Sequence, residues 1–231
     1  MLEGAFRSMS HLEVEGLENI ADFKGPAIVY SPHPFYTDFL GVSIAIGKPI
    51  IPTYEKQKFT SPGIVGTLTA MYVGGIEIKE NMTIAEAKKF LAQVYEALDE
   101  NQWVFIHPEG SDNHYKREVS GNVADLVKIA RSYQNHCKRE KKERPEVALI
   151  PVGEEYKPWP RGKLPPPWAT ELTVRIGKPI FPSEHPNWTM DDYMRIIARL
   201  SGRDYAPDVE TLRKFLNSCA DQVRKQTPLQ Y

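Results

Sequence analysis

The chain has 231 residues, and its 29 Lys and Arg nearly balance its 30 Asp and Glu, which gives a formal net charge of −1 at pH 7. This length is enough to bury one sizeable core, so a single domain over residues 1–231 is expected. The balanced charge lacks the basic excess of nucleic-acid-binding proteins, and we expect no nucleic-acid partner.

The first part of the chain predicts strands that alternate with a helix. Residues 11–20 alternate in polarity and residues 25–31 form a short apolar run, and both patterns are typical of strands. A segment of helical length, 38–47, follows and is closed by Gly47. Residues 48–54 predict another short strand.

The clearest helix of the sequence spans residues 83–101. Thr83 and Glu86 form a capping box at its start. Its apolar positions form one stripe, namely Ile84, Ala87, Leu91, Val94 and Leu98. Before it, residues 59–75 are apolar and interrupted by glycines, so we expect them to be irregular, and residues 76–78 predict a short strand.

The next segments repeat the alternation. Residues 103–111 predict a buried strand that runs into a tight loop, and residues 147–153 predict a second buried strand. Between them lie a predicted helix, 123–136, and a charged run, 138–146, that we expect to face solvent.

The last part of the chain combines irregular structure, one strand and two helices. Prolines in 156–168 block both helix and central strand, and 171–180 predicts a strand. Thr189 with Asp192 caps one predicted helix, and 208–225 predicts another. Strands alternating with helices predict an α/β fold with a central mixed, mostly parallel β-sheet flanked by helices. The motif-bearing core spans residues 12–181 and the C-terminal helices span 189–226.

Cysteine content and hydropathy bear on the compartment. Cys137 and Cys219 match no metal-binding or redox spacing, which predicts a reducing compartment without disulfides. The first residues have no basic segment followed by an apolar stretch, so no signal peptide is predicted. No window holds the roughly 18 apolar residues of a spanning helix. We expect a cytoplasmic protein that is soluble or docks peripherally on the inner face of a membrane.

Two His-x4-Asp pairs each follow a predicted buried strand. They are His33 with Asp38 in "SPHPFYTD" and His107 with Asp112 in "HPEGSD". Ligand sites in α/β sheets lie at the carboxyl ends of strands, where both pairs fall. Five positions along a helix separate two side chains by about 140°, so such a pair needs a loop that leads into a helix.

The first pair has the local sequence for acid–base chemistry. Prolines on both sides of His33 disfavour helix there, whereas Asp38 would lie near the first helical turn. Asp38 would then fix the tautomer of His33, and the other ring nitrogen would take a proton from a substrate hydroxyl. On spacing alone, a helix-capping Asp beside a surface His is the competing interpretation.

Further segments give the chain a family resemblance. From about residue 12 to residue 180 it resembles the glycerolipid acyltransferase family, the PlsC-like 1-acylglycerol-3-phosphate acyltransferases. The segments that carry the likeness appear in the family's order: "LEVEGLENI", "GPAIVYSPHPFYTDF", "YEKQKFTSPGIVG", "GGIEIKEN", "VFIHPEGSDN", "ALIPVG" and "TVRIGKPI". Each block is weak alone, and their shared order makes the resemblance specific.

The resemblance implies an acyltransferase with His33 as general base and Asp38 as its orienting partner. The activated acceptor hydroxyl would attack an acyl thioester on coenzyme A or on acyl carrier protein, and no further cofactor is implied. Glu109 and Gly110 would hold the acceptor or shape the site. Backbone N–H groups of Gly110 and Ser111 are candidate donors to the oxyanion.

The sequence departs from the family where phosphate is bound. The second block ends in Lys79-Glu80 where the family has Arg, and the third carries Asp112 where the family has Arg. Arginine binds phosphate through a fixed bidentate fork, whereas a carboxylate repels phosphate. We therefore expect a lipid alcohol, polyol, sugar or amine-bearing acceptor rather than ordinary lysophosphatidate. Lys56, in the block before the second motif, is a further candidate substrate contact.

Alternatives remain open at this point. Lys79, Lys116 or Arg117 would restore a phosphate site, which makes a true 1-acylglycerol-3-phosphate acyltransferase of phospholipid synthesis the first alternative. A thioester hydrolase and a non-catalytic acyl- or lipid-binding protein are the others. His107 is expected to bond to backbone at a strand end rather than form a second dyad. The histidines show no recognised ligand spacing, so no metal is expected.

Overall fold

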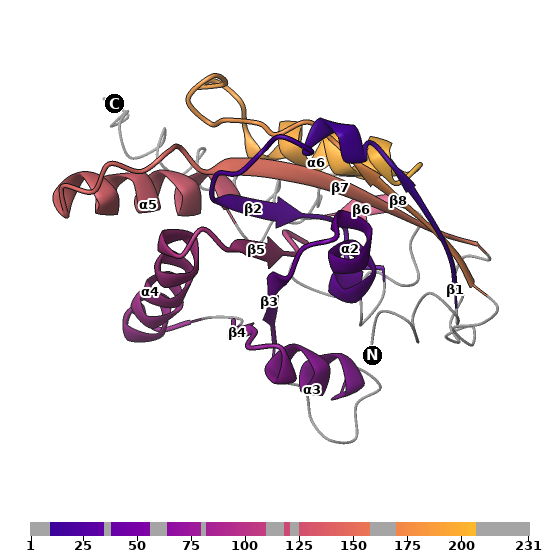
Figure 1. The fold of residues 1–231 in the computed structure, drawn as a ribbon, viewed down its shortest axis with the longest axis horizontal. Helices are drawn as coiled ribbons and strands as arrows, with labels where there is room; N and C mark the ends of the chain where they lie inside the picture. Colours follow the sequence, from indigo (N-terminus) through magenta and orange to yellow (C-terminus); the bar gives the residue numbers. More distant parts are fainter. Residues whose placement is uncertain are drawn as a thin grey trace, which may run out of the picture.

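The computed structural model describes residues 10–34, 38–55, 64–79, 82–109, 118–120, 125–157 and 170–206. Its elements in chain order are β1 Ser10–Glu15, the 3-10 helix η1 Leu17–Asn19, β2 Ala27–Tyr30, α2 Asp38–Ile46, β3 Ile50–Tyr54, α3 Ile64–Tyr72, β4 Ile76–Glu77, α4 Ile84–Asp99, β5 Trp103–Ile106, β6 Glu118–Ser120, α5 Leu126–Arg139, β7 Ala148–Lys157, β8 Thr170–Ile176, α6 Met190–Leu200 and β9 Asp204–Ala206. Figure 1 shows their arrangement.

Seven of the strands form one sheet in the order β1-β8-β7-β2-β5-β3-β4. All neighbours in it are parallel except β7 and β8, which are antiparallel. The strands β2, β5 and β7 therefore end at the same edge. This confirms the predicted α/β fold with a mostly parallel mixed sheet.

Both faces of the sheet are covered, which explains why its central strands are apolar at every position. In β2, Ile28 and Tyr30 face a core shared with α4, α5 and α6. Ala27 and Val29 face a second core shared with α2 and α3. All four residues of β2 are fully buried.

The structure corrects several predicted boundaries. The first strand ends at Glu15 rather than Ile20, because Gly16 takes φ 78° and turns the chain into η1. Residues 59–75 were expected to be irregular, but Ile64–Tyr72 form α3, since one glycine inside a helix costs only about 1 kcal/mol. A small parallel pair, β6 with β9, was not predicted.

Helix capping was predicted correctly, and the predicted apolar stripe of α4 is confirmed at Val94 and Leu98, which are buried, but not at its start. Capping boxes begin α4 at Thr83 and α6 at Thr189. Ile84 was placed on the apolar stripe of α4 but is 79% exposed, whereas Phe90 and Ala97 are buried. Ile84 lies in the first turn, beyond the reach of the core. Among the described helices, none is long and apolar enough to cross a membrane.

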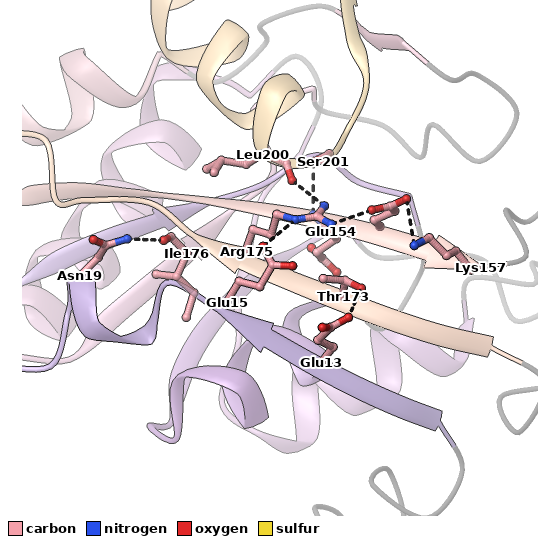
Figure 2. A network of polar contacts seen from close by, with 11 residues as sticks. Glu13, Glu15, Asn19, Glu154, Lys157, Thr173, Arg175, Ile176, Leu200 and Ser201 are labelled. Carbon is pink, nitrogen blue, oxygen red and sulfur yellow. Dashed lines mark hydrogen bonds and ion pairs between the residues drawn. The ribbon is translucent and has the colours of Figure 1, made fainter.

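The strand β7 continues further than predicted. The expected strand ended at Gly153, but β7 runs to Lys157 before the proline-rich segment, which lies outside the described residues, as does the predicted helix 208–225. Figure 2 shows how its outer part is held to its neighbours. Arg175 of β8 bonds to Glu155 of β7 at 2.9 Å, to Glu15 of β1 at 3.0 Å and to the carbonyl of Leu200 at 3.1 Å.

The close contact between β7 and α6 depends on Gly153. A Cβ at this position would lie 2.2 Å from the backbone carbonyl carbon of Leu200, so the end of α6 would have to move. We expect Gly153→Ala to lower the free energy of unfolding by about 3 kcal/mol, as strong overpacking does. Urea denaturation measures this. Gly47→Ala is the control, because φ is 71° but nothing lies within 4 Å, and strain alone costs about 1–2 kcal/mol.

Candidate active site

His33 and Asp38 meet at the carboxyl end of β2. His33 lies in the segment after the strand, and Asp38 is the first residue of α2. The Nδ1 atom of His33 lies 3.1 Å from Oδ2 of Asp38. The Asp38 side chain is fully buried, whereas 20% of the His33 side chain is exposed. A carboxylate at the first turn of a helix is also favoured by the helix dipole.

A buried network continues from Asp38 along β7. The hydroxyl of Tyr156 donates to Oδ1 of Asp38 at 2.9 Å and lies 3.3 Å from Oε2 of Glu154. The hydroxyl of Ser31 lies 2.7 Å from Oε1 of Glu154. This hydrogen bond connects β7 to the end of β2. Ser31, Glu154 and Tyr156 are all buried. One oxygen of the Asp38 carboxylate thus faces His33 and the other accepts from Tyr156.

Burial sets the protonation properties of this network. Burial first, and then the charge of Asp38, raise the pKa of the Glu154 carboxyl well above its usual range. The same two causes raise the pKa of Tyr156, so its hydroxyl stays a donor at neutral pH. Burial lowers the pKa of Arg203, and the charges of Glu109, Asp38 and Glu154 oppose that effect. Arg203 is therefore a buried cation that faces the acidic groups of the site.

Glu109 connects the ends of β5 and β2. It is 5% exposed, and its Oε2 atom accepts a hydrogen bond from the backbone N–H of His33 at 2.8 Å. This bond holds the segment that carries the imidazole. Glu109 therefore has a part in shaping the site, and its contact with an acceptor stays a prediction.

His107 stacks on His33. The two ring centroids lie 3.9 Å apart with an interplanar angle of 17°. The Nδ1 atom of His107 lies 3.2 Å from the carbonyl oxygen of Ser31, which agrees with the expected backbone bond. Asp112, its proposed partner in a second dyad, lies outside the described residues.

Comparisons with known proteins identify the family of this chain. A profile of the family described as Acyltransferase matches residues 11–153, which is more than half of the chain. The chain belongs to the acyltransferase family. The resemblance to glycerolipid acyltransferases and the expectation of an acyltransferase enzyme are thereby confirmed. No curated protein matches the sequence.

The fold of this acyltransferase is shared with a solved structure. PlsC from Thermotoga maritima, a 1-acyl-sn-glycerophosphate (LPA) acyltransferase, superposes with a TM-score of 0.55 at 19% identity. The match covers 85% of this chain and 73% of that chain. At this identity the likeness shows a common fold.

The remaining predicted site residues of the acyltransferase divide into two groups. Lys79 is described, and its Nζ atom bonds to Oε1 of Glu86 in the first turn of α4 at 2.7 Å. The others lie outside the described residues, namely Lys56, Glu80, Gly110, Ser111 and Asp112. The proposed oxyanion donors and acceptor contacts among them stay predictions.

Three side chains of the site are of types that ligate metals. Ligand atoms of His33, Asp38 and His107 lie within 4.8 Å of one another. However, the imidazole rings are stacked, so their in-plane lone pairs run side by side instead of converging on one point. Both Nδ1 atoms already face oxygen partners. The arrangement suits acid–base chemistry better than metal binding.

Glu154, Tyr156 and Arg203 were not predicted from the sequence. The family match ends at residue 153, so all three follow the last matched position. A weak signal was present: Glu154 and Tyr156 are two residues apart directly after an apolar strand, and in a continued strand they share a face. Arg203 follows α6 and reaches the site only through the fold.

Proposed function

We propose that this acyltransferase moves a fatty acyl group from an acyl thioester, carried by coenzyme A or acyl carrier protein, to a hydroxyl of a lipid, polyol or sugar-lipid acceptor. The observation that carries the proposal is the 3.1 Å contact between Nδ1 of His33 and the buried carboxylate of Asp38. This contact favours the tautomer in which Nδ1 of His33 carries the proton and donates it to Asp38. The Nε2 atom of the partly exposed ring then serves as the base.

The reaction follows from this geometry. His33 takes the acceptor proton on Nε2 as the acceptor oxygen bonds to the thioester carbonyl carbon, and the carbonyl oxygen becomes an oxyanion. The C–S bond then breaks, the ester carbonyl re-forms, and the thiolate receives the proton from His33. Asp38 stabilises the imidazolium between these steps. No further cofactor enters this scheme.

We propose further that the acceptor is not ordinary lysophosphatidate. Carboxylates occupy the second- and third-block positions, Glu80 and Asp112, where the family has arginine. Among the described cations, Lys79 bonds to Glu86, and Arg203 is buried facing carboxylates. Lys79 already has an anionic partner, and the charge of Arg203 is already attracted by acidic groups of the site, which favours an acceptor without a phosphate. Such acceptors would reach the protein at the cytoplasmic surface of a membrane.

An acceptor screen tests this proposal. Labelled long-chain acyl-CoA, and in parallel acyl carrier protein loaded with the same chain, are offered with lysophosphatidate, monoacylglycerol, long-chain alcohols and glycolipids. We expect the kcat/KM for a neutral acceptor to exceed that for lysophosphatidate by at least about tenfold, because an unpaired phosphate beside a carboxylate costs more than 1 kcal/mol. A preference for lysophosphatidate would refute the acceptor proposal. Release of free fatty acid without transfer would favour a thioester hydrolase.

A further inference from the structure

The hydrogen-bond network around Glu154 contains more contacts than hydroxyl protons. The Ser31 hydroxyl faces two acceptors, the carbonyl of Pro32 at 2.8 Å and Oε1 of Glu154 at 2.7 Å. The Tyr156 hydroxyl also faces two, Oδ1 of Asp38 at 2.9 Å and Oε2 of Glu154 at 3.3 Å. Two hydroxyls supply two protons to four contacts. A proton on the Glu154 carboxyl supplies a third proton. Hydrogen bonds then connect Ser31, Glu154, Tyr156 and Asp38.

The added proton belongs on Glu154 rather than on Asp38. Asp38 lies at the start of α2 and accepts from Tyr156 while facing the His33 ring, and all three favour its ionised form. Glu154 lies inside β7 with 0% exposure. Its backbone N–H donates to Ser201 at 3.2 Å, on the α6 side of the strand (Figure 2). Burial and the nearby Asp38 raise its carboxyl pKa.

We propose that Glu154 is a positioning residue, held as a neutral carboxylic acid, which commits the Tyr156 hydroxyl to Asp38 and thereby keeps Asp38 ionised and aimed at His33. The inference rests on the proposed function for its catalytic meaning. If Glu154 were ionised, two carboxylates would compete for the single Tyr156 proton. Asp38 would then lose the hydrogen bond from Tyr156 for part of the time. The contact between Asp38 and His33 would lose its fixed geometry.

The charges around the site agree with a neutral Glu154. Groups that face it come from four elements: Ser31 after β2, Asp38 of α2 with His33 before it, Tyr156 of β7, and Arg203 after α6. Glu109, at the end of β5, also faces Arg203. With Glu154 neutral, the positive charge of Arg203 balances one of the two carboxylates, Asp38 and Glu109. These three groups then carry one excess negative charge, which is neutralised when His33 takes the acceptor proton.

The protonation state is measured first, in the wild-type protein without substrate. The infrared spectrum at neutral pH is expected to contain the carbonyl stretch of a buried carboxylic acid, and Glu154→Gln is expected to remove it. Glu155→Gln is the matched control, because the adjacent side chain bonds to Arg175 and, by the alternation of a strand, lies on the other face of β7. Absence of the wild-type band would overturn the proposal, and so would its persistence in Glu154→Gln.

Unfolding gives a second measurement without substrate. The unfolded chain releases the Glu154 proton near the ordinary glutamate pKa, whereas the folded chain keeps it, so stability falls as pH rises above that value. Glu154→Gln lacks this effect. Between about pH 5 and 7, the ratio of the wild-type to the Glu154→Gln unfolding constants should rise by about tenfold per pH unit. A ratio that does not change with pH would overturn the proposal.

The effect on the dyad is read from the NMR titration of the His33 ring. We expect its midpoint in Glu154→Gln to match the wild type, because an amide replaces a neutral acid. A shift to lower pH would show that an anion had been removed and would overturn the proposal. Tyr156→Phe should raise the midpoint, because Asp38 loses a donor and attracts the imidazolium more strongly. An unchanged midpoint in Tyr156→Phe would also contradict it.

Kinetics with the acceptor from the screen complete the test. Because Gln retains polar partners for Tyr156 and Ser31, kcat should fall about tenfold more in Glu154→Ala than in Glu154→Gln. Equal losses of kcat in Glu154→Ala and Glu154→Gln would mean that the polar atoms of Glu154 do not position Asp38, which would contradict the proposal. The infrared, unfolding and NMR results do not depend on turnover. If they hold while no acceptor is acylated, the proposed function fails and the neutral Glu154 stands.

Discussion

Replacing His33 by Ala is expected to reduce acyl transfer by about 10²–10⁴-fold, which is the usual contribution of a positioned general base. The loss should be in kcat, because the imidazole acts when the acceptor proton is transferred. Its ring is 20% exposed and the segment keeps its backbone bond to Glu109, so the variant should fold. Steady-state kinetics with labelled acyl-CoA measure the effect, and thermal unfolding checks the fold.

A matched control for His33→Ala is available on the first strand. His11 is exposed on β1, which pairs with β8 and is separated from β2 by β8 and β7, so His11→Ala should leave kcat and KM unchanged. A kcat of His33→Ala within about threefold of the wild type would contradict the general-base role, because a threefold loss is far smaller than the usual contribution of a general base. Absence of turnover with every acceptor tested, in the wild type as well, would instead favour a non-catalytic acyl- or lipid-binding member of the family.

The parts of the fold that follow from local chemistry were predictable. Buried strands such as β2 and β5 are short apolar runs between turn residues, and the capping boxes at Thr83 and Thr189 fix the starts of α4 and α6. The dyad was predictable for a similar reason. His33 and Asp38 are five residues apart, and the contact between them needs only a strand end and a helix start.

The parts that depend on tertiary packing were not predictable from the sequence. Glu154 and Tyr156 are 116 or more residues from the dyad, and only the parallel pairing of β2 with β7 brings them to it. The burial of Ile84 was wrong because periodicity cannot tell where the neighbouring surface ends. The helix α3 was missed because its apolar residues and glycine gave no clear period.

Replacing Asp38 by Asn should have an effect of similar size, about 10²–10⁴-fold in kcat, through the tautomer of His33. The Tyr156 hydroxyl donates to Oδ1, so in the variant it would hold the amide oxygen on its own side. The amide NH₂ would then face Nδ1 of His33, which must become an acceptor. The ring proton moves to Nε2, where the acceptor proton should have gone. Heteronuclear NMR of the imidazole nitrogens reports this change directly.

Because Tyr156 enforces the wrong amide orientation, its removal should partly repair Asp38→Asn. In the double variant with Tyr156→Phe the amide can rotate and present its oxygen to His33. We expect kcat to recover by roughly tenfold over Asp38→Asn, within the coupling range of contacting residues. Asp99→Asn is the matched control, because Asp99 accepts from the Tyr133 hydroxyl at the same 2.9 Å but lies away from the dyad, between α4 and α5. If the losses of kcat in Asp38→Asn and Tyr156→Phe simply add in the double variant, Tyr156 does not orient the side chain at position 38. The proposed effect of the β7 residues on His33 would then be wrong.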